Sequence, residues 1–561
     1  MNRITVLLCI TISRIHSFTV TPSCRRSTRL ITDHGYRPLY STSVENNARK
    51  PGVLVLSDLP EEAFEVEDED LALIKKLDDN VSTDSDQFLE KSFIPTFVLC
   101  WCVALLSALD RVAMSVAILP LATEYHLTDA IKGEISSVFS IGYGLAIIPC
   151  GLLAATVSPR IIMGVGVSLW SFATFGTPIA ASLIQLTQLP VESLDLDTMA
   201  TSSEFVVGNV APLLFIRTVM GAAESVVLPA TQRLLANWVP VSRKTIAVAG
   251  IISGFQCGTV LAYLISPWVM ENLGGWRGLF YVYGILGAFW LVPWNILSKD
   301  GPENQYSISN DIITKDSESV PLQSFDNHEN LTEISQNSQW KSAIASIKDA
   351  PWSSFAKSQA VWAMIIAHAA NNWGLYNMLS WTPTFYSEQY GLNVRDSAFF
   401  SIFPSIAGAI CGLSSGFIAD KIMSSFENQN QVEVRTNVRR TFQGLALLGP
   451  AACLFALSGH IPDDPMTAEA LLMGTVGLQA FNAAGYGSSP QEKAGKKWSG
   501  LLYSITTLPG VLVGSLGVYV TGQILDLTDQ DWSQVFSVNA GIDIVGAIAF
   551  IMFYNSKKEF D

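Results

Sequence analysis

Twelve stretches of mostly apolar residues constrain the fold of this 561-residue chain more than any other feature. Each is close to the ~20 residues that a helix needs to cross the hydrocarbon core of a bilayer. They are predicted at 94–119, 133–155, 161–186, 206–230, 245–270, 277–298, 359–386, 397–419, 438–459, 467–489, 499–524 and 532–554. Only 15% of the residues are Asp, Glu, Lys or Arg, whereas soluble proteins have about 25%. The sequence therefore predicts an all-α membrane protein.

The twelve stretches fall into two groups of six. We predict an N-terminal six-helix bundle over 93–298, a flexible central loop over 299–357 and a C-terminal six-helix bundle over 358–556. The central loop is rich in Ser, Asn, Asp and Glu and has no apolar period, which is typical of a linker. The basic residues of the loops that follow even-numbered spans are Arg160, Arg243, Lys244, Lys421, Arg435, Arg439, Arg440, Lys493, Lys496 and Lys497. This bias places both termini on the side of synthesis.

The first 50 residues have the composition of a targeting segment. Residues 4–12 form an apolar core behind Arg3, too short to cross a membrane and of signal-peptide length, and 19–50 are rich in Arg, Ser and Thr like a transit peptide. With Phe18 at the junction, 1–50 resembles the two-part plastid presequence of algae with secondary plastids. A plain signal peptide or an uncleaved tail is the alternative.

Residues 51–92 are dominated by Asp and Glu and are predicted to be an acidic disordered tail. The formal net charge of −15 argues against a nucleic-acid partner, because such binding needs a basic surface. The histidines show no metal-ligand spacing, and no constellation typical of an enzyme is present. We therefore predict a protein that is not an enzyme and that has no cofactor.

Four charged residues stand inside predicted spans: Asp110, Arg111, Arg217 and Glu224. Each costs about 2.5–3.5 kcal/mol near the bilayer centre, so together they oppose insertion by roughly 10 kcal/mol if unpaired. One interpretation is a structural salt-bridge network. The other makes the arginines anion clamps, since guanidinium is always charged and its planar fork fits phosphate or carboxylate oxygens.

Arg217 and Glu224 lie seven residues apart, which puts them on one face of a helix. Gly221 is on the same face and allows close approach of a partner helix or a substrate. Under the clamp interpretation, Glu224 is the candidate carrier of a coupling proton. Asp543 is a weaker candidate for binding a cation, because a salt bridge or a water-facing position explains a mid-span acid better.

Several strings resemble known transporters. The string G-F-I-A-D-K-I-M at 416–423 is similar to the loop motif of the major facilitator superfamily, and its match falls on Gly416, Asp420 and Lys421. The corresponding string at 151–160 departs from the motif. In the superfamily this loop locks the bundle, so the resemblance implies a gating role for the three matched residues.

Three further strings resemble the anion:cation symporter family: D-R-V-A-M-S-V-A-I at 110–118, R-T-V-M-G-A-A-E-S-V-V-L-P-A at 217–230 and N-N-W-G-L-Y-N-M-L-S-W-T-P-T-F-Y at 371–386. The resemblance implies the major facilitator fold and transport of phosphate or an organic anion driven by sodium, protons or membrane potential. It places functional residues on Arg111, Arg217 and Glu224. Relatives often carry His or Arg where this chain has Asn371.

The sequence thus predicts a secondary transporter of inorganic phosphate or a related small anion, working by alternating access in a plastid membrane. Its predicted partners are the anion and the lipid bilayer, with H⁺ or Na⁺ as coupling ion and the chain as a monomer. The candidate site residues are Arg111, Arg217, Asn371 and Tyr376 for the substrate, Glu224 and Asp110 for coupling, and Gly416, Asp420 and Lys421 for gating. The rivals are transport of another organic anion, such as ascorbate or glutamate, and an anion sensor that moves nothing.

Overall fold

The computed structural model describes residues 68–187, 202–239, 244–301, 350–426, 430–494 and 498–560. The predicted presequence over 1–50 and most of the predicted central loop lie outside these residues. Residues 80–561 form one compact unit. The regular elements of its described residues are helices. These residues also contain one isolated β-bridge, between Ala494 and Phe560.

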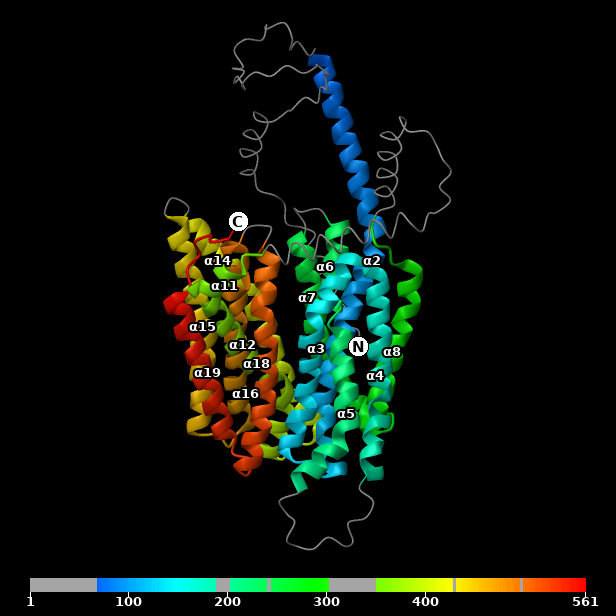
Figure 1. Ribbon diagram of the computed structural model, residues 1–561, viewed down its shortest axis with the longest axis vertical. Coiled ribbons are helices and arrows are strands. Elements are labelled where there is room, and N and C mark those ends of the chain that lie inside the picture. Colours follow the sequence, from blue (N-terminus) through cyan, green and yellow to red (C-terminus); the bar gives the residue numbers. More distant parts are fainter. Residues whose placement is uncertain are drawn as a thin grey trace. The chain divides into compact units, whose positions relative to one another are not determined.

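The N-terminal half contains seven helices, drawn from blue to green in Figure 1. They are α2 (Asp68–Tyr125), α3 (Asp129–Thr156), α4 (Pro159–Thr187), α5 (Ser202–Glu224), α6 (Val227–Trp238), α7 (Lys244–Asn272) and α8 (Gly275–Leu297). The fourth predicted span is divided, because α5 ends at Glu224 and α6 starts at Val227. Six spans of this half are long and apolar enough to cross a membrane, as the sequence predicted.

The C-terminal half repeats this plan, from yellow-green to red in Figure 1. Its elements are α11 (Trp352–Lys357), α12 (Gln359–Tyr390), α13 (Val394–Phe400), α14 (Ile402–Ser425), α15 (Gln431–Gly459), α16 (Pro465–Gln479), η7 (Ala480–Ala483), η8 (Tyr486–Ser488), α17 (Ser489–Lys493), α18 (Ser499–Leu527) and α19 (Trp532–Phe553). Four spans of this half meet the same length and composition criterion. The other two predicted spans are α12, which is rich in polar residues, and the short α16. The chain is an all-α membrane protein with twelve spans in two six-helix bundles.

One predicted boundary is wrong, and a second prediction overlaps a helix. Helix α2 begins at Asp68, within the range 51–92 of the predicted acidic tail, whose disorder stays a prediction. The tenth span was predicted to run to residue 489, but α16 ends at Gln479 and short 3₁₀ helices follow.

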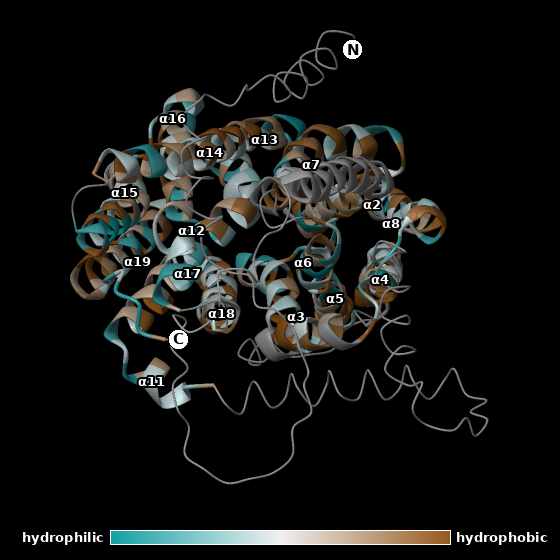
Figure 2. Ribbon diagram, turned by 90° about the horizontal axis from the view of Figure 1, so that it is seen from above, coloured by the Kyte–Doolittle hydropathy of each residue, from teal (hydrophilic) through white to brown (hydrophobic). Residues whose placement is uncertain are grey.

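Many large apolar side chains of the bundles are exposed, and Figure 2 shows the hydrophobic residues of the helices in brown. Phe172 is 79% exposed and Leu413 is 76% exposed. Such surfaces are rare on soluble monomers. They fit contact with lipid, so the exposed belt and the apolar spans are two signs of the same environment.

The two halves meet through α3 against α18 and through α7 against α13 and α14. At one end, here called the acidic end, Lys132 Nζ lies 2.6 Å from Asp129 Oδ1 and 2.8 Å from Glu388 Oε1 of the other half. A Cβ on Gly522 of α18 would lie 2.4 Å from the Asp129 carbonyl oxygen, so the backbones touch there. Near the other end of α3, Gly151 has open space around its missing side chain. The halves are therefore closed against each other at the acidic end.

The opposite end, here called the basic end, carries Arg160, Arg439, Arg440 and Lys493. In the N-terminal half, Arg160 N donates 2.9 Å to Asp300 Oδ1, which joins the start of α4 to the segment after α8. In the C-terminal half, Lys493 Nζ is fully buried and lies 2.5 Å from Glu559 Oε1 of the terminal tail. These contacts tie each half to itself.

Candidate functional site

A cavity lies between the two halves, with walls from four helices. Its lining residues are Arg111, Met114 and Ser115 of α2, Ser136, Phe139 and Ser140 of α3, Arg217 of α5, and Tyr376, Leu379 and Ser380 of α12. The N-terminal half supplies seven of these ten residues and both of the charges. The surface offered by α12 is neutral.

The two arginines share one aromatic ring. The guanidinium carbon of Arg111 lies 5.1 Å from the centre of the Phe139 ring, and that of Arg217 lies 5.2 Å from the same centre. Arg111 is also 5.4 Å from the ring of Tyr143. Cation–π attraction stabilises a desolvated guanidinium, and the ring holds both positive groups near the same cavity.

Glycines on α3 and α5 bring Phe139 to this position. A Cβ on Gly221 would lie 1.9 Å from the Phe139 carbonyl oxygen, and one on Gly142 would lie 2.1 Å from the Thr218 carbonyl oxygen. Neither contact is possible for a larger residue, so the two helices touch backbone to backbone. The sequence left open whether a helix or a substrate approaches Gly221, and the structure places α3 there.

Glu224 is buried beneath Arg111. Its Oε2 accepts a hydrogen bond of 2.8 Å from Ser107 Oγ and lies 3.8 Å from Arg111 Nη2. Its Oε1 is buried and has no hydrogen-bond partner. Arg111 thus reaches both the carboxylate and the cavity, while Glu224 is hidden from the cavity behind it.

Arg217 has fewer partners than Arg111. It is only 2% exposed, and its Nη1 lies 3.3 Å from the sulfur of Met220, while its Nε is buried without a hydrogen-bond partner. Within the described residues, no carboxylate oxygen lies within 4 Å of Arg217. Glu224 and Asp110 act on its charge from farther away, and Asp110 lies beside Trp170 and Thr174 of α4. A salt-bridge network therefore accounts for Arg111 in part and for Arg217 poorly.

The other candidate residues fall in different places. Tyr376 lines the cavity with the arginines. Asn371 is not among the lining residues: its side-chain oxygen accepts 3.0 Å from Asn482 Nδ2, and its carbonyl oxygen accepts 2.8 Å from Gln479 Nε2. Its amide therefore holds α12 against η7 inside the C-terminal half.

The three gating candidates lie in the last turns of α14, well separated in sequence from the cavity helices. Asp420 and Lys421 are exposed, and Gly416 has open space around it. With the halves closed at the acidic end, this loop belongs to the opposite end. Its gating role stays a prediction.

Sequence reasoning did not identify the contribution of α3 to the cavity. Ser136, Phe139 and Ser140 line it together, at the i, i+3 and i+4 spacing of one helix face. Two serines on one face of an otherwise apolar span were the available signal. The described residues contain no group of three or more His, Cys, Asp or Glu that could hold a metal ion.

Comparisons with known proteins agree with this geometry. The family model of the Major Facilitator Superfamily matches residues 100–518. The chain is 33% identical to the sodium-dependent phosphate transport protein 1, chloroplastic, of Arabidopsis thaliana, over 83% of this chain and 79% of that protein. It is 31% identical to the chloroplastic ascorbate transporter of the same plant, over 83% of this chain and 75% of the relative.

Solved structures share the fold at low sequence identity. A bacterial homologue of the human lysosomal transporter Spinster, in an inward-facing and unoccupied conformation, has a TM-score of 0.59 and 14% identity, over 81% of this chain and 95% of that one. A D-xylose–proton symporter has a TM-score of 0.58 and 13% identity, over 83% of this chain and 100% of that one. At these identities the likeness concerns the fold alone. The family model and the sequence relatives go further: this chain belongs to the Major Facilitator Superfamily, among relatives that are chloroplastic phosphate and anion transporters.

Proposed function

We propose that this protein moves inorganic phosphate or a related small anion across a membrane by alternating access, coupled to a cation. The observation that carries the proposal is the pair of arginines beside one cavity between the two halves. Arg217 is buried with an unpartnered Nε, and a buried guanidinium with unused donors is a natural place for an oxyanion.

Alternating access needs a site between two halves that can close at either end. The cavity lies at the junction of α2, α3 and α5 with α12. Lys132 and Glu388 join the halves at the acidic end, and no atom lies within 4 Å of the missing Cβ of Gly151, near the other end of α3. The described conformation therefore supports a cycle in which the anion leaves or enters at the basic end.

The substrate class follows from the charges that surround the cavity. A neutral solute would leave the two guanidinium groups without a counter-charge, whereas an oxyanion can accept hydrogen bonds from both. The serines of α3 and α12 add hydroxyl groups that can donate to further oxygens. The named substrates of the relatives, phosphate and ascorbate, are both anions that fit this description.

Coupling is proposed to work through competition for Arg111. Its Nη2 lies 3.8 Å from Glu224 Oε2, so an anion that draws Arg111 into the cavity takes the counter-charge away from a buried acid. The acid is then neutralised best by a proton or Na⁺. Asp110 is the alternative coupling group in the same half.

The protein is a multi-pass membrane protein, and we place it in a plastid membrane. Its relatives are chloroplastic, and residues 1–50 have the composition of a signal followed by a transit segment. A fusion of 1–50 to a fluorescent protein should reach the plastid, and Phe18→Ala should keep that fusion outside. Import that ignores Phe18 would contradict the two-part presequence.

The decisive experiment is uptake by liposomes that contain the purified chain. Labelled phosphate, ascorbate and glutamate are offered separately under sodium, proton and voltage gradients. We expect concentrative uptake of at least one anion under one cation gradient. Saturable anion binding without any uptake would favour the sensor, and uptake of ascorbate or glutamate instead of phosphate would favour the organic-anion rival.

A further inference from the structure

Asp543 is a buried acid that the anion site does not use. It lies in the middle of α19, is 1% exposed, and its Oδ1 has no hydrogen-bond partner. The sequence favoured a salt bridge or a water-facing position for this residue. Both expectations are wrong, because the side chain is enclosed and none of the ion pairs of the described residues includes it.

The carboxyl group lies next to a glycine of the neighbouring helix α12. A Cβ on Gly374 of α12 would lie 3.9 Å from Asp543 Oδ1 and 2.8 Å from Gln479 Nε2 of α16. Gln479 is 3% exposed, and its Oε1 also lacks a hydrogen-bond partner. The unpartnered oxygen of Asp543 and the side chain of Gln479 therefore both lie beside Gly374, where any larger residue would press against the Gln479 amide.

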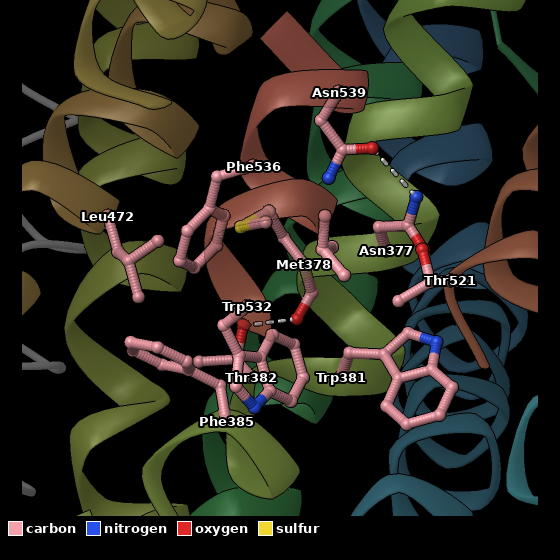
Figure 3. A pocket seen from close by; sticks show the side chains of 11 residues that line it. Asn377, Met378, Trp381, Thr382, Phe385, Leu472, Thr521, Trp532, Phe536 and Asn539 are labelled. Carbon is pink, nitrogen blue, oxygen red and sulfur yellow. Dashed lines mark hydrogen bonds between the residues drawn. The ribbon is translucent and has the colours of Figure 1, made fainter. Parts of the chain in front are cut away.

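Polar side chains lie between Asp543 and a second cavity, and Figure 3 shows that cavity. Asn539 lies one helical turn before Asp543 and so shares its face of α19. Its Oδ1 accepts 2.5 Å from Trp373 Nε1 and 3.2 Å from Asn377 Nδ2, and the latter contact is the dashed line between the two amides in Figure 3. Asn377 Oδ1 in turn accepts 2.9 Å from Thr521 Oγ1. Asn377, Thr521 and Asn539 all line the cavity, so polar groups continue from it toward Asp543.

Four titratable groups on α12, α15 and α16 have contacts with other residues, although His368 Nδ1 and Glu469 Oε1 remain without a hydrogen-bond partner. On α12, His368 stacks against Tyr486 at 4.5 Å between ring centres. On α15, Arg439 pairs with Glu492, and Arg440 donates to the carbonyl oxygen of Tyr554. On α16, Glu469 accepts from the hydroxyl group of Tyr386. No basic group is therefore directed at Asp543 from these four residues.

A carboxylate enclosed within a membrane protein needs a positive partner or a proton. We propose that Asp543 binds a monovalent cation, a proton or Na⁺, in the C-terminal half and separately from Glu224. The cation reaches it from the cavity past Asn377 and Asn539. The inference rests on the proposed cation coupling, but it concerns binding that needs no anion.

The test measures cation binding directly on the purified full-length chain, without anion. Melting temperature is followed by tryptophan fluorescence, first against Na⁺ with choline as the replacing ion at constant pH, then against pH without Na⁺. We expect one of the two series to raise the melting temperature of the wild type, which tells Na⁺ from a proton. Asp543→Asn, which keeps the shape and removes the charge, should flatten that series.

Two further variants keep the test independent of general damage. Glu469→Gln neutralises the other buried acid of the same half and should keep the wild-type dependence. Gly374→Ala retains the acid but places a methyl group 3.9 Å from Asp543 Oδ1 and 2.8 Å from Gln479 Nε2, and should weaken Na⁺ dependence more than pH dependence. An Asp543→Asn protein that responds as the wild type does, or a loss confined to Glu469→Gln, would overturn the proposal. Failure of anion uptake in liposomes would leave this result untouched.

Discussion

Arg111 Nη2 lies 3.8 Å from Glu224 Oε2, and while 29% of the Arg111 side chain is exposed, none of the Glu224 side chain is. The arginine therefore stands between a hidden acid and an open cavity. Ser107 Oγ donates a hydrogen bond of 2.8 Å to the same carboxylate oxygen. A residue that can serve either a carboxylate or a substrate oxyanion gives the two sites a shared component, which is the physical basis of coupling.

Arg217→Lys should reduce anion uptake by at least tenfold while the protein still inserts and folds. Lysine keeps the positive charge but loses the planar fork and the stacking on Phe139, whose ring centre is 5.2 Å from the Arg217 guanidinium carbon. Initial rates of phosphate uptake by liposomes measure this. Arg395→Lys makes the same change at a side chain that is 73% exposed and should leave the rate unchanged. Normal uptake by Arg217→Lys would make Arg217 a structural residue or a simple point charge.

Glu224→Gln should keep exchange of anion for anion but abolish accumulation driven by an imposed cation gradient. Glutamine imitates the neutral acid and can still accept from Ser107, while Arg111 no longer has a competing carboxylate. Both modes are measured in the same liposomes, with Glu271→Gln, whose side chain is 50% exposed, as the matched control. If Glu224→Gln still concentrates anion in response to the gradient, coupling moves to Asp110 or Asp543.

Lys132→Met should loosen the closed acidic end. Lys132 Nζ donates to Asp129 and, across the halves, to Glu388 at 2.8 Å, and methionine keeps the length of the side chain without the charge. A cysteine placed at Ser140, in the cavity wall, should react faster with an impermeant maleimide added from the acidic end. Lys357→Met, at an exposed position in the last turn of α11, is the control. Equal labelling rates in both backgrounds would show that the lysine does not hold the halves together.

Gly221→Ala should destabilise the protein by about 1–3 kcal/mol, the usual cost of overpacking. Its Cβ would lie 1.9 Å from the carbonyl oxygen of Phe139, so α3 and α5 must separate. Gly151→Ala is the matched control, because open space surrounds Gly151. Thermal melting in detergent should show a lower midpoint for Gly221→Ala and no decrease for the control. Equal midpoints would mean that the helices adjust without cost.

The membrane class and the approximate positions of the twelve spans could be predicted from the sequence because helix length and hydropathy are local properties. Arg111 and Arg217 could be identified as candidates too, since a charge in an apolar span is visible without a structure. The sequence did not predict the pairing of Lys132 with Glu388, which are 256 residues apart, or the engagement of Asn371 by Asn482 and Gln479. Those contacts depend on which faces of distant helices meet, and single residues do not encode that.

The break after Gln479 shows another limit. The residues from 480 to 489 are apolar enough to extend the span, yet the chain leaves the α-helix there. The side-chain oxygen of the buried Gln443 accepts a hydrogen bond of 3.0 Å from the backbone N–H of Tyr486 in this segment. A Cβ on Gly485 would lie 2.3 Å from the same oxygen. A neighbouring helix thus holds the segment that follows the break.

The neutrality of the α12 wall has a consequence for selectivity. Because both positive groups of the cavity belong to the N-terminal half, an anion bound there would stay with that half when the two halves rock. Tyr376, Leu379 and Ser380 form the neutral wall that moves relative to it. Exchanging them would alter which sizes of anion can be enclosed and leave the hold on charge intact, so selection by shape and selection by charge can change independently in this protein.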